Sequence, residues 1–150
     1  KALAGKEGFE LKTKEEEKKK ESEESKLKIY GNAERESISE ETPGSIYRVT
    51  MDTTHPLAFG YGNTYFSLVL EGAAYQYLND GWNVGVTKSK DLIAGFAGVK
   101  AQEKLKNSLI WGVQDMGRGN VVYLANNPLF RGFWQNGKLL FGNAVFVLGN

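Results

Sequence analysis

The charges of this chain are concentrated at its N-terminal end, and that segregation limits how the chain can fold. Of the 37 Lys, Arg, Asp and Glu residues, 22 lie in the first 41 positions. Residues 12–26 carry runs of Glu and Lys without an apolar stripe, so this segment has nothing to bury against a core. Glu at 15–17 can pair with Lys at 18–20, which favours a solvated helix or a linker. We expect a charged helical arm over residues 1–42 and a strand-rich domain over 43–150.

The strand-rich domain combines alternating apolar residues with glycine-containing turns. Alternation of β-branched and aromatic residues predicts strands over 45–52 and 63–70. Turn residues predict two hairpins, one joining 75–79 to 82–86 through Asp80-Gly81 and one joining 109–113 to 120–125 through residues 116–119. Helical periodicity or capping predicts helices over the residue ranges 32–41, 99–109 and 136–148.

These elements predict an α+β fold. We expect a mixed, mainly antiparallel sheet with two packed helices and a charged peripheral N-terminal helix. At 150 residues the chain is long enough to bury a core of its own. No apolar run approaches the roughly 20 residues that a membrane-spanning helix needs, so we expect no membrane span. The acidic residues of the arm offset its basic ones, which argues against a nucleic-acid partner.

The residue inventory offers few routes to catalysis. The chain has no cysteine and a single histidine, His55, whereas zinc normally takes three or four protein ligands. Asp52 could orient the His55 ring in a hydrolase, but the simpler interpretation is that His55 caps a turn. The glycines of residues 115–119 precede a strand and not a helix, so they suit a hairpin better than a phosphate loop. The body carboxylates show no spacing that suggests a glycosidase pair. We therefore expect no catalytic residue and no metal ligand.

The best candidates for ligand binding lie among aromatic residues near the C-terminus. Arg131 stands between Phe130 and the pair Phe133 and Trp134, where a guanidinium can clamp an anion or stack on a ligand. The same arginine could equally hold a loop in place. We name His55, Arg131 and Trp134 as candidate ligand-binding residues. Trp82 and Trp111 would join them if the fold brings those rings near Arg131.

Three stretches of the body carry a family resemblance. They are residues 43–60, residues 80–86 with 93–98, and residues 112–123 continuing through 127–134 to 139–146. Together they resemble the C-terminal region of Bacteroidetes-type zinc carboxypeptidases of the carboxypeptidase A-like superfamily. In that family the peptidase domain is followed by a domain similar to class I glutamine amidotransferases. The resemblance covers nearly the whole chain from about Gly31.

The resemblance implies a non-catalytic accessory or interaction domain of a secreted zinc metallocarboxypeptidase, periplasmic or extracellular. The chain, which begins at Lys1, would be a fragment or a processed product. Zinc would belong to the upstream peptidase domain of the same protein, and that domain would be the partner, alongside a homodimer formed through an exposed apolar face. No catalytic residue is carried over, because His55 is followed by Pro56-Leu57-Ala58 where the peptidase has His-x-x-Glu. The amidotransferase Cys and His-x-Glu pair are also missing.

Three alternatives stay open at this point. The fold would be α/β, half of an amidotransferase-like fold, if the chain keeps the parallel strand order of the family it resembles. The function would be that of a small-ligand, peptide or glycan binding module if Arg131 and the tryptophans line a pocket. An independent hydrolase would need a Ser or Thr nucleophile in contact with His55.

Overall fold

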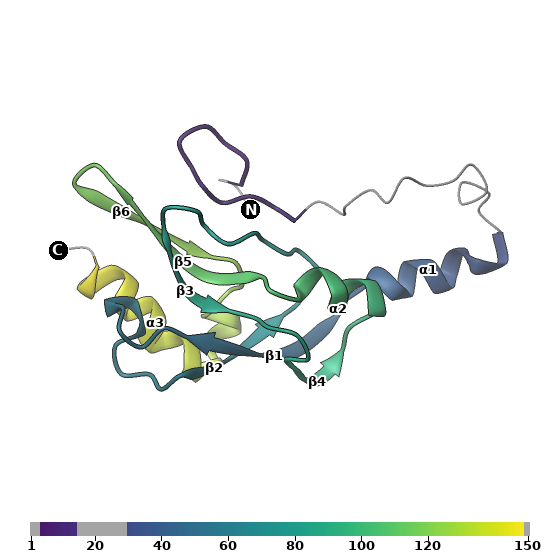
Figure 1. The fold of residues 1–150 in the computed structure, drawn as a ribbon. Helices are drawn as coiled ribbons and strands as arrows, with labels where there is room; N and C mark the ends of the chain where they lie inside the picture. Colours follow the sequence, from purple (N-terminus) through teal and green to yellow (C-terminus); the bar gives the residue numbers. More distant parts are fainter. Residues whose placement is uncertain (1–3, 15–29, 149–150) are drawn as a thin grey trace.

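The computed structural model describes residues 4–14 and 30–148 and shows an α+β domain (Figure 1). Its sheet has six strands in the order β2-β1-β3-β5-β6, with β4 also paired to β1, and each pairing between them is antiparallel. The strands are β1 (Gly44–Met51), β2 (Thr64–Val69), β3 (Trp82–Val86), β4 (Leu92–Phe96), β5 (Leu109–Met116) and β6 (Gly119–Leu124). The predicted α+β class is confirmed, and the antiparallel order is not that of the α/β alternative.

The helices lie around this sheet. The α-helices are α1 (Ala33–Glu40), α2 (Val99–Leu105) and α3 (Lys138–Gly142), and α3 continues into a π-helical turn at Asn143–Val147. Short 3-10 turns occupy Tyr30–Asn32, Pro56–Ala58, Phe130–Gly132 and Gln135–Gly137. The helix predicted over 99–109 ends at Leu105, because Leu109 already begins β5.

Strand β1 organises the sheet because it pairs on both edges. One edge pairs along its length with β2, and the other pairs with β4 near Gly44 and with β3 near Met51. Its side chains alternate between buried and less buried positions, as in a strand with one face against a core. Val49 lies opposite Tyr65 of β2, and both are buried in the main apolar cluster with Trp111. The strands predicted over 45–52 and 63–70 are confirmed.

The hairpin predicted between β5 and β6 is also present. Met116 lies opposite Gly119, and Gly117 takes a positive φ of 62° at the turn. The glycines of residues 115–119 therefore form a hairpin turn, as the sequence favoured. Strand β5 is buried from Leu109 to Val113, with side chains packed in two different apolar clusters.

The hairpin predicted at Asp80-Gly81 is wrong. Strand β3 does begin at Trp82, but it pairs with β1 and β5 and not with residues 75–79. Residues 75–79 are instead held by the Asn83 side chain, where backbone hydrogen bonds between two strands were expected. The Asn83 side chain accepts from the Leu78 N–H at 2.8 Å and donates to the Leu78 carbonyl at 3.0 Å. The N–H groups of Asp80 and Gly81 both donate to the carboxylate of Glu10.

Residues 4–14 lie against the body of the molecule. Thr13 bridges to Tyr75, and Lys14 and Gln76 extend the pairing through backbone hydrogen bonds of 2.9 Å to Ala74 and Lys12. Leu11 is only 4 % exposed and packs with Tyr75, Leu78, Leu109 and Tyr123. This part of the arm thus buries apolar surface, which the charge pattern did not predict. The charged run at 15–29 lies outside the described residues, and the division at residue 43 stays a prediction.

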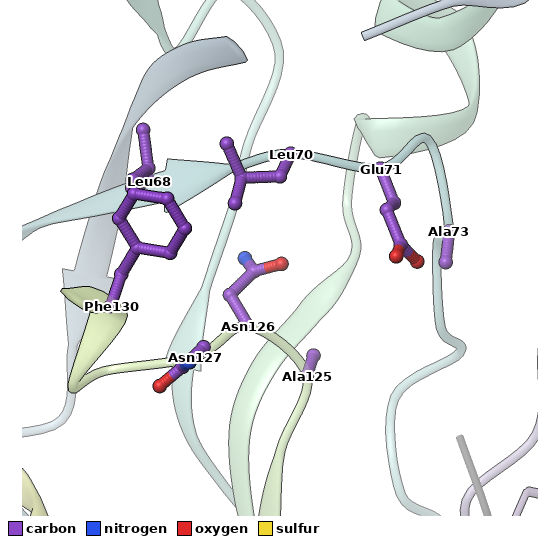
Figure 2. A pocket seen from close by; sticks show the side chains of 8 residues that line it. All are labelled: Leu68, Leu70, Glu71, Ala73, Ala125, Asn126, Asn127 and Phe130. Atoms are coloured by element: carbon purple, nitrogen blue, oxygen red, sulfur yellow. The ribbon is translucent and has the colours of Figure 1, made fainter. Parts of the chain in front are cut away.

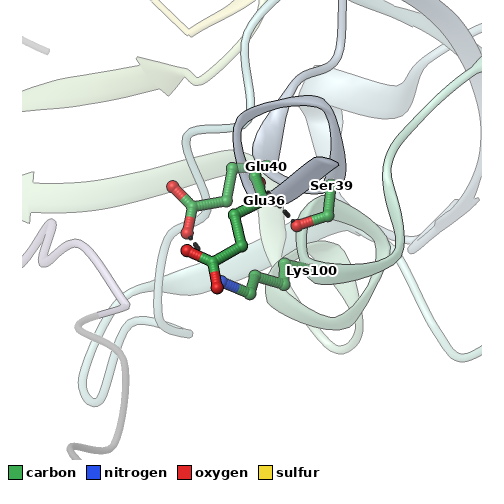
Figure 3. A network of polar contacts seen from close by, with 4 residues as sticks. All are labelled: Glu36, Ser39, Glu40 and Lys100. Carbon is green, nitrogen blue, oxygen red and sulfur yellow. Dashed lines mark hydrogen bonds and ion pairs between the residues drawn. The ribbon is translucent and has the colours of Figure 1, made fainter. Parts of the chain in front are cut away.

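Helix α1 is peripheral and has no buried residue (Figure 1). Its attachment to α2 includes an ion pair of 3.1 Å between Glu40 and Lys100, beside an intrahelical bond from the Ser39 hydroxyl to the Glu36 carbonyl (Figure 3). The C-terminal helical segment is held more deeply, because the buried Asn143 amide donates to the carbonyls of Leu57 and Phe59. A terminal helix over 136–148 is confirmed, with the π-helical turn as an added feature.

Candidate functional site

A pocket of about 230 Å³ lies between the end of β2 and the segment that follows β6. Figure 2 shows side chains from these two segments facing each other across it. The lining residues are Leu68, Leu70, Glu71, Ala73, Ala125, Asn126, Asn127 and Phe130. We call this the Phe130 pocket. Its volume is below the roughly 300–1,000 Å³ typical of sites for drug-sized ligands, so it suits a single small chemical unit.

Two asparagines supply fixed polar groups. The Asn126 amide nitrogen donates to the Ser67 hydroxyl at 3.1 Å, which fixes the side chain with its carbonyl oxygen toward the Glu71 side of the pocket (Figure 2). The Asn127 carbonyl oxygen accepts from the Leu129 N–H at 2.9 Å, so its amide nitrogen is the group that remains to donate. The Asn126 orientation follows from a bond to the distant strand β2 and that of Asn127 from a local turn bond, and together they give the pocket an acceptor and a donor.

Apart from the Glu71 side chain, the other walls of the Phe130 pocket are apolar. Leu68 and Leu70 come from the end of β2, and Phe130 begins the 3-10 turn after β6. The Phe130 ring is braced by Phe133, whose centroid lies 5.8 Å away in an edge-to-face arrangement. The pocket therefore combines an aromatic ring with polar groups of known orientation.

Arg131 lies beside this pocket and does not line it. Its guanidinium carbon is 5.1 Å from the centroid of the Phe130 ring, within cation–π range. Arg131 also takes a φ of 50°, in the left-handed region that few non-glycine residues adopt. The Arg131 side chain is exposed to solvent. Its contact with Phe130 stabilises the ring that forms one wall of the pocket.

Trp134 joins the aromatic side chains beside Arg131, because its ring centroid lies 6.2 Å from that of Phe133, which in turn contacts Phe130. Trp134 has a buried indole nitrogen near Tyr65, without a well-aligned hydrogen bond. Burial raises the pKa of Tyr65 to about 12, against a smaller opposing effect of Trp134. Trp111 is fully buried against Tyr65, and Trp82 lies 6.0 Å from His55. Among the described residues, Arg131 and Trp134 are thus connected through the rings of Phe130 and Phe133, and His55 and Trp82 form a separate pair.

His55 caps a turn. Its Nδ1 accepts the Leu57 N–H at 3.1 Å at the start of the Pro56–Ala58 turn. Burial lowers the pKa of His55, against the opposing charges of Asp52 and Asp115. Asp52 itself accepts from the Thr54 N–H and hydroxyl, and these hydrogen bonds lower its pKa. Because Nδ1 accepts a backbone N–H, the proton of the neutral ring lies on Nε2, so the nitrogen left to face a substrate is a donor and not a free base.

Sequence reasoning missed the polar groups of the Phe130 pocket. Local sequence patterns assign no binding role to Glu71 or Asn127. The signal that could have found them is the Asn126-Asn127 pair directly after a strand, close in sequence to an Arg among aromatics. What the sequence could not show is that the end of β2 faces this segment.

Comparison of the chain with protein-family models, with curated proteins and with solved structures finds no significant match in any of the three. Within residues 4–14 and 30–148, no three His, Asp or Glu side chains lie together as a metal site would need. No helix of that described part has the length and apolar character to span a bilayer. The zinc carboxypeptidase resemblance therefore stays a prediction from the sequence.

Proposed function

We propose that this chain is a non-catalytic binding domain that holds one sugar unit of a glycan in the Phe130 pocket. The observation that carries the proposal is the combination of an aromatic wall with an oriented acceptor and an oriented donor. Sugar hydroxyl groups donate and accept hydrogen bonds, so they match the Asn126 carbonyl oxygen and the Asn127 amide nitrogen. The C–H face of a sugar ring packs on an aromatic ring such as Phe130.

A peptide is the alternative occupant. A peptide that adds to the sheet pairs along the edge of a strand, whereas the Phe130 pocket takes only Leu68 from β2 and no residue from β6 among its lining. The pocket volume of about 230 Å³ also fits one compact unit better than an extended chain. For these reasons the glycan is the preferred ligand, and peptide binding is the outcome that would replace it.

The test is a binding screen of the whole chain against a glycan array and a peptide library, followed by titration of the best ligand. Asn126→Ala and Phe130→Ala should each weaken binding about three- to tenfold, since a net hydrogen bond or ring contact contributes about 1 kcal/mol. Tyr30→Ala is the matched control, because this exposed aromatic lies outside the pocket. Equal binding by all three variants would place the ligand elsewhere.

The wider setting that we propose rests on the family resemblance. The binding domain would be an accessory part of a secreted zinc carboxypeptidase, in the periplasm or outside the cell, positioned beside the upstream peptidase domain. Reading the coding sequence upstream of Lys1 tests this, and a domain with His-x-x-Glu is the expected result. The chain incubated with zinc should release no C-terminal residues from peptides, and chelator-sensitive release would contradict its non-catalytic role.

A homodimer is the second partner that we propose. The exposed side of the C-terminal helical segment carries large apolar residues, with Phe146 75 % exposed, and Phe59 nearby is 71 % exposed. Asn143 ties this segment to the backbone of Phe59, so the two segments that carry these exposed rings lie side by side. Apolar patches of this kind mark interaction surfaces in soluble proteins.

A further inference from the structure

A second cavity of about 180 Å³ lies between β1, the loop from β3 to β4, and helix α2. It is separate from the Phe130 pocket and shares no residue with it. Tyr47 from β1 forms part of its wall, Lys88 and Lys90 come from the loop, and Lys106 follows α2. Three cationic side chains thus reach one small cavity from two parts of the chain.

Tyr47 presents an unsatisfied hydrogen-bonding group at this cavity. The residue is 4 % exposed, and its hydroxyl has no hydrogen-bond partner among the described residues. A buried hydroxyl without a partner is rare in native structures and is commonly explained by a bound water or ion. The cavity wall therefore holds a donor that lacks an acceptor.

The charges around the cavity favour an anionic acceptor. The lining holds three lysines against the two carboxylates of Asp91 and Glu103, which leaves one positive charge in excess; Asp91 accepts the Lys88 backbone N–H at 2.5 Å, and Glu103 is paired with Lys106. The ammonium groups of Lys88 and Lys90 have no ion-pair partner within the described ranges. Asp91 holds the loop in a turn, and Lys90 within it takes a φ of 67°. Both lysines are exposed and can swing toward the wall at Tyr47.

We infer that this cavity binds a small oxyanion of the phosphate type, held by the Tyr47 hydroxyl and the ammonium groups of Lys88 and Lys90. A tetrahedral oxyanion offers several oxygens and can accept from all three donors at once, whereas a water molecule would leave the lysine charges unmatched. Lysine binds phosphate as a point charge, which suits flexible side chains at the mouth of a cavity.

The experiment is a titration of the ¹⁵N-labelled chain with inorganic phosphate at constant ionic strength, with chloride and acetate as comparison anions. Phosphate should cause saturable shifts of the Lys88 and Asp91 amide resonances, and acetate and chloride should not. Tyr47→Phe keeps the ring volume and should weaken phosphate binding about tenfold, as loss of a hydrogen bond to a charged group predicts. Lys90→Gln should weaken it as well.

Lys138→Gln is the matched control, because this exposed lysine lies on α3 away from the cavity. It should leave phosphate binding unchanged. The inference is overturned if phosphate produces no saturable shift, if Tyr47→Phe binds as well as the parent chain, or if acetate binds equally. These results are independent of glycan binding, so failure here leaves the Phe130 pocket proposal intact.

Discussion

His55 shows how a residue with catalytic potential is used for structure. Its Nδ1 accepts a backbone N–H, which requires the neutral ring, and burial lowers its pKa from the ordinary value near 6.5. A folded-state pKa below the unfolded one means that the unfolded chain binds more protons in that range. The contribution of His55 to the free energy of unfolding is therefore present above the pKa of the unfolded state. It is lost as the pH falls through the pKa of the folded state.

We predict that the free energy of unfolding falls as the pH is lowered from 7 to 5, and that His55→Asn removes part of this decline. Asparagine can cap the same turn with its side-chain oxygen but does not titrate. Urea denaturation at a series of pH values measures the effect. A pH profile unchanged by His55→Asn would show that other groups cause the decline.

Gly95 has a backbone conformation that disfavours any residue with a side chain. It has a φ of 84°, and an added Cβ would lie 2.3 Å from the Gly44 carbonyl oxygen across the β1–β4 pairing. We predict that Gly95→Ala lowers the free energy of unfolding by about 1 kcal/mol or more. Gly119→Ala is the control, because that position has open space and no positive φ. Chemical denaturation compares the two, and equal stabilities would contradict the steric argument.

Local patterns predicted the elements whose contacts are local. The β5–β6 hairpin follows from its turn, and β1 and β2 from alternation of strand-forming residues. The Asp80-Gly81 hairpin was wrong because Glu10, far away in sequence, occupies the two N–H groups. Strand β4 was missed because Leu92–Phe96 is short, mostly exposed and broken by Gly95. Its partner, β1, is also distant in sequence.

The segment of residues 4–14 gives the sharpest test at the scale of an element. We predict that Leu11→Ala lowers the free energy of unfolding by about 2 kcal/mol or more, because a buried leucine leaves a cavity when truncated. Leu139→Ala, at an exposed position, should cost less than that. Both are measured by chemical denaturation. If Leu11→Ala is neutral, this segment is a solvated arm, as the charge pattern first suggested.

At the scale of the whole molecule, the sequence predicted the fold class but not the sites. The antiparallel α+β architecture follows from strand patterns and turns. The Phe130 pocket joins segments that are distant in sequence, such as those of Leu68 and Asn127. The second cavity, which Tyr47 and Lys106 line, does the same. No local pattern contains that information, because it depends on how the strands are ordered in the sheet.

The exposed apolar surface gives a prediction for the assembled molecule. We expect the chain to form dimers at high concentration, and Phe146→Lys to shift it toward the monomer, since a charge on an apolar contact is costly to bury. Sedimentation velocity over a range of concentrations measures this. Lys12→Glu, a charge change in the N-terminal segment and away from this surface, is the control. A chain that is monomeric at all concentrations would remove the dimer from the proposal.

The docking of residues 4–14 also has a consequence for the order in which the protein acquires its structure during synthesis. The Glu10 N–H bonds to the Gln114 side chain, 104 positions later, and Leu11 packs on Tyr123. The ribosome makes residues 4–14 early, yet their binding surface is complete only after β6 has emerged. This segment therefore stays unpaired until the strands that it packs against have been made, and its docking adds a short pairing beside a sheet that is otherwise finished.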